Sequence, residues 1–119
     1  MSWDFHLRDP VTGEEIQFDQ PHFMRGGTYA VGGTYDAHFN VTYNYGKVYR
    51  RHNGNVPFGS QFDGKVAHET IPILEEMITK LGDDVSADYW EATEGNAKRA
   101  LHALLALAKM RPDGVWDVC

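Results

Sequence analysis

The chain has 119 residues, of which 42% are hydrophobic and 24% charged, so it can form one modest hydrophobic core and lacks the composition of a disordered protein. Its 17 acidic residues outnumber its 11 basic ones, and the formal net charge of -6 argues against tight, non-specific binding to long nucleic acids. No stretch approaches the roughly 20 apolar residues of a membrane span, the start lacks the pattern of a signal peptide, and the lone Cys119 excludes an intrachain disulfide. We therefore expect one domain, residues 1–119, in a reducing cytoplasm.

The first half of the chain predicts β-structure. Residues 3–7 alternate weakly and precede a turn, after which a return strand over 15–18 and a loop over 19–25 are expected. The glycine pair at 32–33 predicts a two-residue hairpin. The clearest strand spans 37–44, where apolar positions that include Tyr43 alternate with polar ones and so share one face. The alternation then breaks, and the spacing predicts a short helix or an irregular turn.

The second half predicts two main helices. In the first, apolar residues recur three and four apart over 66–81, and Gly82 is the expected stop. Pro72 lies inside this run, so it either kinks the helix or marks its first turn, with Thr70 as N-cap.

The last helix has the strongest pattern. Thr93 is its expected cap, an alanine-rich apolar stripe follows, and Pro112 ends it, after which the tail at 115–116 is expected to pack back. The sequence therefore predicts an α+β fold, with an antiparallel β-sheet in the N-terminal half packed against two main C-terminal helices.

Signatures of catalysis, metal binding or a cofactor are missing. No two of the six histidines lie three or four residues apart, and no Cys-x-x-Cys pair exists, so a metal site could only assemble from distant residues. The chain has no Gly-x-Ser-x-Gly elbow and no phosphate-binding glycine loop. We expect no catalytic residue, no metal and no cofactor.

The run from 40 to 52 is the most informative stretch, because it places three tyrosines among three cations in an acidic protein. Tyrosine rings can stack on a base, and arginines donate paired hydrogen bonds to phosphate. Tyr49, Arg50 and Arg51 are therefore candidate ligand contacts. The alternative is that the tyrosines belong to the edge of the core.

The start of the last helix is a second candidate region. Free backbone amides there favour phosphate, Asn96 and Arg99 lie in the first turns, and Tyr89 with Trp90 could form a stacking wall. The alternative is that Asn96 only helps to cap the helix and Trp90 belongs to the core. Arg25 and Arg111, each beside a glycine or proline, could reach into a cleft or lie on the surface.

Three motifs resemble phage proteins of the first Thoeris anti-defence family. They are the Met-Ser-Trp-Asp-Phe start, the Asn-Val-Thr-Tyr-Asn-Tyr strand and the segments Asn-Ala-Lys-Arg-Ala-Leu and Lys-Met-Arg-Pro-Asp-Gly near the end. The resemblance implies a sponge, not an enzyme: a protein that sequesters cyclic ADP-ribose isomers and leaves them intact. Some members also bind cyclic trinucleotides, and members assemble as homodimers or as hexamers built from dimers.

The same resemblance implies particular ligand contacts. Phe5 is similar to an aromatic that stacks on adenine, and Arg25 and Arg111 to arginines that hold the pyrophosphate. Asn96 and Asp19 resemble further polar contacts, and Arg50 or Arg51 would fit a second site for a trinucleotide.

Two other functions remain open from the sequence. One is an enzyme that degrades such a nucleotide, and the other is a protein-interaction module that inhibits a host defence protein, for which the acidic segment 83–94 would be suited. The expected partner in the favoured case is a small cyclic nucleotide, with no long nucleic acid and no membrane.

Overall fold

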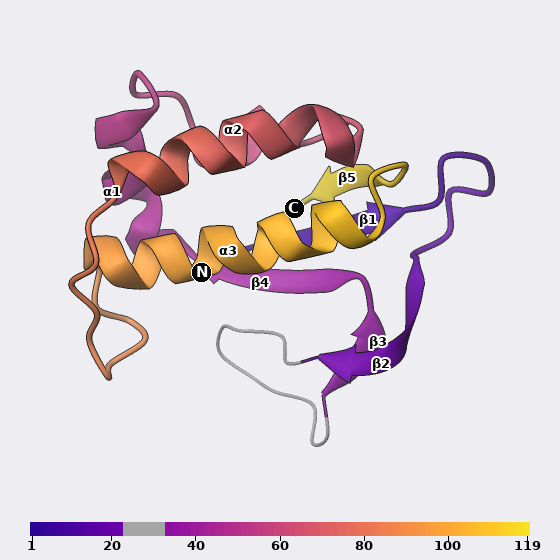
Figure 1. The fold of residues 1–119 in the computed structure, drawn as a ribbon, viewed down its shortest axis with the longest axis horizontal. Helices are drawn as coiled ribbons and strands as arrows, with labels where there is room; N and C mark the ends of the chain where they lie inside the picture. Colours follow the sequence, from indigo (N-terminus) through magenta and orange to yellow (C-terminus); the bar gives the residue numbers. More distant parts are fainter. Residues whose placement is uncertain (23–32) are drawn as a thin grey trace.

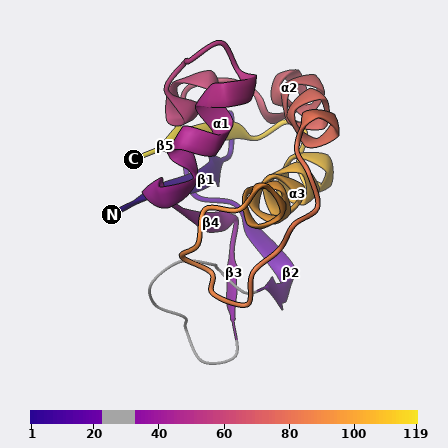
Figure 2. The ribbon, with the colours of Figure 1, turned by 90° about the vertical axis from the view of Figure 1, so that its left-hand side faces the viewer.

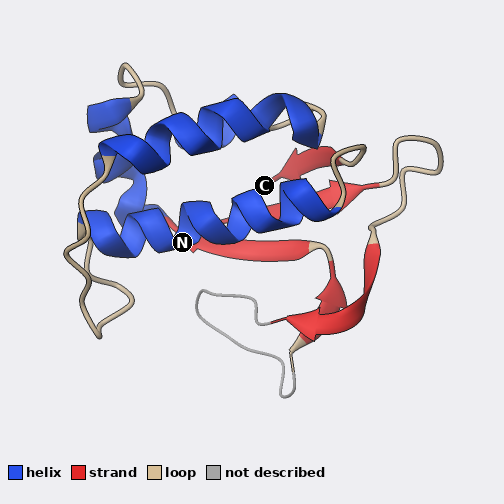
Figure 3. Cartoon of the chain, in the orientation of Figure 1, coloured by secondary structure: helices blue, strands red, loops and turns tan. Residues whose placement is uncertain are grey.

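The computed structural model describes residues 1–22 and 33–119, and these form the α+β fold that the sequence predicts (Figure 1). Antiparallel strands occupy the N-terminal half, and two long helices occupy the C-terminal half (Figure 3). Arg25 and most of the predicted hairpin at 32–33 lie outside the described residues. None of the helices within the described residues is long and apolar enough to cross a membrane.

A three-stranded sheet lies at the centre. β1 (Ser2–Arg8) runs between β4 (His38–Thr42) and β5 (Val115–Val118) and is antiparallel to both. The C-terminal tail therefore packs back, as predicted, and it does so as a strand. Trp116 of β5 is buried against the ring of Phe5, 5.8 Å away between centroids.

The strand predicted at 15–18 and the loop predicted after it are wrong in their bounds. β2 (Gln17–His22) is a six-residue strand that pairs with β3 (Thr34–Asp36) in a separate two-stranded sheet. Just before β2, Glu15 forms a bridge with Arg8 of β1, and the N–H of Ile16 donates to the carbonyl of Leu7 at 2.9 Å. β2 is mostly exposed and carries no apolar alternation, so the periodicity that reveals a half-buried strand is absent from it.

β4 delivers the chain to the helical part of the molecule. Phe39 and Val41 are buried as predicted, but Tyr43 is 41% exposed, because a 3-10 turn, η1 (Tyr43–Tyr45), begins there and rotates it off the buried face. The side chain of Thr42 starts this turn by accepting from the backbone N–H of Asn44. The predicted short helix follows as α1 (Gly46–His52).

The helices α2 (Ala67–Lys80) and α3 (Glu94–Met110) lie side by side over one face of the sheet (Figures 1 and 2). Thr93 caps α3 as predicted, accepting from the backbone N–H of Asn96 at 3.0 Å. Of the two alternatives for Pro72, the one with Thr70 as N-cap is wrong, because α2 begins at Ala67 with Val66 as its N-cap and Pro72 lies inside the helix.

Thr70 has a buried role instead of capping α2. Its hydroxyl donates to the carbonyl of Ala67 at 2.7 Å and accepts from the indole N–H of Trp116 at 2.9 Å. The pair joins α2 to β5 across 46 residues, inside a single core cluster that also contains Phe58 of the short turn η2 (Phe58–Gln61). A buried donor and a buried acceptor thereby satisfy each other.

We expect the substitution Thr70→Val to lower the free energy of unfolding by about 1–3 kcal/mol, because the indole N–H would stay buried without an acceptor. Urea unfolding measures this change. Thr79→Val is the matched control, since Thr79 makes the same bond to a carbonyl three residues earlier but is exposed. Equal losses in the two variants would contradict the role given to the Trp116–Thr70 bond.

Candidate functional site

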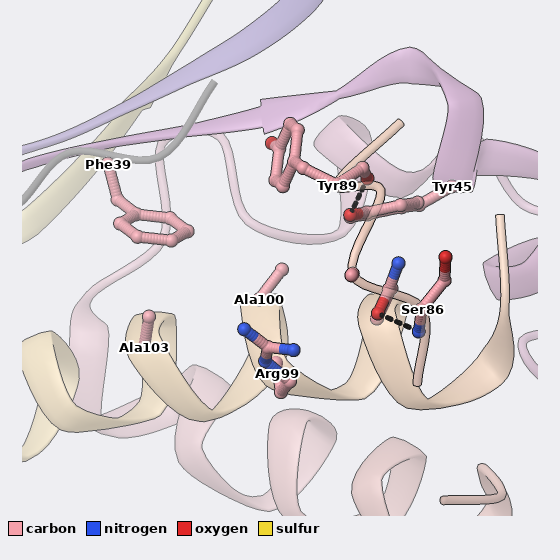
Figure 4. A pocket seen from close by; sticks show the side chains of 9 residues that line it. Phe39, Tyr45, Ser86, Tyr89, Arg99, Ala100 and Ala103 are labelled. Atoms are coloured by element: carbon pink, nitrogen blue, oxygen red, sulfur yellow. Dashed lines mark hydrogen bonds between the residues drawn. The ribbon is translucent and has the colours of Figure 1, made fainter. Parts of the chain in front are cut away.

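A hollow of about 200 Å³ lies where β4, η1, the segment 83–93 and α3 meet (Figure 4). Aromatic rings line one side, from Phe39, Tyr45 and Tyr89. The first half of α3 forms the floor, where Ala100 and Ala103 are too small to fill the space beneath the rings. The alanine-rich stripe seen in the sequence thus lets β4 and the segment 83–93 approach α3 closely, and at Ala100 and Ala103 it leaves the space of the hollow.

Asn96 holds the segment 83–93 against α3. Its side-chain oxygen accepts from the backbone N–H of Ser86 at 3.0 Å, and its amide donates to the carbonyls of Asp88 and Glu91, both at 3.0 Å. The side chain is almost fully buried. The alternative that Asn96 only helps to cap the helix is incomplete, because its side chain also shapes one wall of the hollow. Both N–H groups of the side-chain amide, and one acceptor position of its oxygen, are already bonded within the protein.

Gly95 lets the same segment approach α3 closely. Its N–H donates to the carbonyl of Asp84 at 3.2 Å. A Cβ at position 95 would lie 2.7 Å from the carbonyl carbon and oxygen of Asp84, closer than such atoms approach in proteins. A larger residue would therefore push the segment away from the helix.

Tyr45 and Tyr89 form a fixed aromatic wall. The hydroxyl of Tyr45 donates to the backbone carbonyl of Tyr89 (Figure 4). The hydroxyl of Tyr89 accepts from the backbone N–H of Thr42 at 3.2 Å. The rings meet edge to face, with centroids 5.6 Å apart. Trp90, the next residue, is 47% exposed, so the alternative that it belongs to the core is wrong.

Arg99 supplies the cation at this hollow. Its side chain is exposed at the rim, and it forms no ion pair or hydrogen bond with the part of the chain that the structure describes. Lys98, its neighbour, differs: it binds Asp83 at 2.6 Å, and this contact holds the pKa of the Asp83 carboxyl below its ordinary value. Arg99 is therefore the group here that can pair with an anion from outside.

Phe5 and Tyr49 lie in the core and do not line the hollow. Both are fully buried, and Phe5 packs among the rings of Phe58, Phe62 and Trp116. Tyr49 stacks on Phe58 at 4.0 Å, its hydroxyl donates to a carbonyl of α3, and burial holds its pKa well above the ordinary value. In the described structure these rings stabilise the fold and present no face to solvent.

The remaining candidates are dispersed. Arg111 forms a bidentate pair with Asp113 at 2.9 and 3.0 Å, and it lies eight residues beyond the hollow along α3, about 12 Å at 1.5 Å per residue. Asp19 is exposed on β2. Arg50 is exposed on α1, and Arg51 beside it pairs with Glu94 at 3.5 Å. Convergence of these residues with Arg25 across protomers stays a prediction.

The structure thus brings Asn96 and Arg99 together with the tyrosine wall. Sequence reasoning named Asn96, Arg99 and Tyr89 in one region, but it did not select Phe39 or Tyr45 for this hollow. The strand alternation assigns Phe39 to the buried face. No local sequence pattern distinguishes a buried ring that borders a hollow from one that is inside the core.

The histidines of the outer sheet face are hydrogen-bonded. His6 and His38 stack with centroids 4.2 Å apart, and their ring nitrogens contact Glu15 at 2.6 Å and Asp4 at 2.9 Å. Within residues 1–22 and 33–119, no three His, Cys, Asp or Glu side chains are grouped so as to hold a metal ion.

Comparison with protein-family models found no match, and comparisons with curated proteins and with solved structures found none either. The resemblance to the anti-defence family therefore depends on the sequence motifs quoted above.

Asn96→Ala removes three hydrogen bonds at a buried position, and we expect it to lower the free energy of unfolding by about 2–4 kcal/mol. Denaturant unfolding measures this loss, and the backbone amide of Ser86 should also exchange faster with deuterium. Asn44→Ala is the matched control, because that exposed amide donates a single bond, to the carbonyl of Trp90. A loss at Asn96 no larger than at Asn44 would contradict its role.

Glu94, in the first turn of α3, contacts both α1 and Gly82 just beyond the end of α2, and its carboxylate should make the stability of the fold depend on pH. Its carboxylate accepts from the N–H of Gly82 at 2.8 Å and contacts His52 at 3.2 Å, and these bonds hold its pKa below the ordinary value of 4.5. Ionised Glu94 thus stabilises the fold above pH 4.5, and this contribution is lost as the pH falls through the pKa of the folded state.

We expect Glu94→Gln to be less stable than the unmodified protein at pH 7, with the difference shrinking below pH 4.5. Thermal unfolding over a pH series measures it. Glu75→Gln is the control, since Glu75 is exposed on α2 and has no ion pair within the described residues. A difference that is constant with pH would exclude the Glu94 carboxylate as the titrating group.

Proposed function

We propose that the protein binds and sequesters a cyclic ADP-ribose-type nucleotide without cleaving it, as a phage anti-defence sponge in the cytoplasm of the infected cell. The observation that carries the proposal is the position of Arg99, a cation without an internal partner in the described chain, at a hollow walled by Tyr45 and Tyr89. Aromatic rings for a base and a guanidinium for a phosphate are the two chemistries that such a ligand requires. The motif resemblance supports the same ligand class.

The size of the hollow limits how the ligand would sit. At about 200 Å³ it is smaller than the ~300–1,000 Å³ of pockets that enclose whole ligands of this size. We infer that one part of the nucleotide enters beside Tyr45 and Tyr89, while the pyrophosphate stays at the rim against Arg99. A second copy of the chain would cover the remainder, in line with the homodimer or hexamer that the resemblance implies.

The affinity that a sponge needs is within reach of this site. Nanomolar binding corresponds to about 12 kcal/mol, and a ligand of about 35 heavy atoms at ~0.3 kcal/mol per atom gives on the order of 10 kcal/mol. Stacking adds ~1–3 kcal/mol per base. The protein therefore needs a few well-placed groups, and its negative net charge is no obstacle.

Arg99→Ala should weaken binding of a cyclic ADP-ribose isomer about 10- to 100-fold, because a charge-assisted hydrogen bond contributes ~1.5–3 kcal/mol. Isothermal titration measures this change. Lys109→Ala is the matched control, since Lys109 is an exposed cation near the other end of α3. No binding to the unmodified protein at micromolar concentration would refute the proposal for this ligand.

Chromatography of the ligand released by heat denaturation distinguishes the sponge from a degrading enzyme. A sponge returns the nucleotide intact after prolonged incubation, whereas an enzyme returns products. Products that disappear in the Arg99→Ala variant would replace the proposed function by catalysis at the same hollow.

A further inference from the structure

A second hollow is lined by neighbours in sequence of Tyr45 and Tyr89. It is an open groove of about 390 Å³ lined by Tyr43, Asn44, Lys47, Trp90 and Ala92. Tyr43 and Asn44 directly precede Tyr45 in η1, and Trp90 directly follows Tyr89, so the same two segments contribute residues to both hollows. The amide of Asn44 joins these segments by donating to the carbonyl of Trp90 at 2.9 Å.

The groove exposes large rings that the fold does not need to expose. Tyr43 is 41% and Trp90 47% exposed, although each packs edge to face on a neighbouring ring, Trp3 at 4.7 Å and Tyr89 at 4.9 Å. Tryptophan and tyrosine, together with arginine, are the residues that most often dominate the energy of protein interfaces. Rings held in place in this way would lose little conformational freedom on binding.

Cations continue this surface along α1. Lys47 and Arg50 lie three residues apart and therefore on one helix face. Both are exposed, and neither side chain has an ion pair or hydrogen bond to the described part of the chain. Arg51, on the same face, is only loosely paired with Glu94. Two unneutralised cations beside two exposed rings in a protein of net charge -6 are an arrangement complementary to an acidic partner.

We propose that this surface, made of Tyr43, Asn44, Lys47, Arg50 and Trp90, docks an extended acidic segment of another protein that carries proline or aliphatic residues at its centre. Aromatic-lined open grooves accept extended proline-containing segments, because such segments are already ordered and fit between rings. Acidic residues at one end of the segment would meet Lys47 and Arg50. A long nucleic acid fits less well, because its charges run along its whole length and would meet Asp88 and Glu91, whereas a short segment can place its few acidic residues at Lys47 and Arg50 and its uncharged centre at Trp90.

The test uses two short synthetic peptides of equal length with a Leu-Pro-Pro-Leu centre, one ending in glutamates and the other in lysines. Indole N–H signals of the full-length protein, labelled with nitrogen-15, report which tryptophan is touched. With the acidic peptide, the Trp90 signal should shift in a saturable way, while that of Trp116, buried and bonded to Thr70, should stay in place.

A charge reversal makes the test specific. The double variant Lys47→Glu and Arg50→Glu should lose at least tenfold in affinity for the acidic peptide and should gain binding to the basic one. Lys109→Glu, a reversal on a distant exposed cation, should change neither. Trp90→Ala should abolish binding of both peptides while leaving the unfolding transition within a few degrees of the unmodified protein.

Four results would overturn the proposal. The first is no shift of the Trp90 signal at millimolar peptide, and the second is equal binding of the acidic and basic peptides. The third is a stronger shift with a thymidine oligonucleotide. The fourth is a change in sedimentation of the protein alone on Trp90→Ala, which would make the surface an interface between copies of this chain. Because the peptide test and the nucleotide titration use different ligands and different residues, a failure of the peptide proposal leaves the nucleotide proposal to be judged by the Arg99→Ala titration.

Discussion

The close contact between the segment 83–92 and the first turns of α3 is the constraint on which both hollows depend. Gly95 permits the contact, since a side chain there would collide with the backbone of Asp84. Asn96 then fixes the segment with three hydrogen bonds. This contact places Tyr89 at one hollow and Trp90 at the other.

The distribution of charge partners separates structural cations from available ones. Lys98, Arg51 and Arg111 each contact a carboxylate of the protein. Arg99 and Arg50 have no such contact with the described residues. These two cations are therefore too few to attract a polyanion over a long distance. In a protein of negative net charge they act over a few ångströms, which favours ligands that place one or two negative groups beside a ring.

The two proposals use different residues of the same two segments, η1 and residues 89–90. In the first hollow, Tyr89, with the buried ring of Tyr45 behind it, would contact one part of a small nucleotide that is mostly enclosed. In the groove, Tyr43 and Trp90 would contact an extended chain that remains partly in solvent. Since hydrogen bonds of Tyr45 and Asn44 hold residues 89 and 90 to η1, a change at one hollow has a direct structural route to the other.

Local pattern in the sequence was sufficient for β4 and for the two long helices. Alternation revealed β4, three-and-four spacing revealed α2 and α3, and Thr93 marked a helix start, because each depends on side chains a few residues apart. β2 was placed wrongly, since an exposed strand carries no such alternation. For α2, the sequence left open whether Pro72 lies inside the helix or in its first turn, and the structure places it inside, with Thr70 bonded to Trp116 from the other end of the chain.

The three tyrosines of the most informative run show what only the tertiary structure decided. The sequence determined that Tyr43, Tyr45 and Tyr49 are close together near cations. It could not determine that the first faces the groove, the second borders the hollow and the third lies in the core. Two things set the directions of these side chains: the change from strand β4 to η1 and α1, and packing against other elements such as α3 and η2. Packing between elements leaves no pattern in the local sequence.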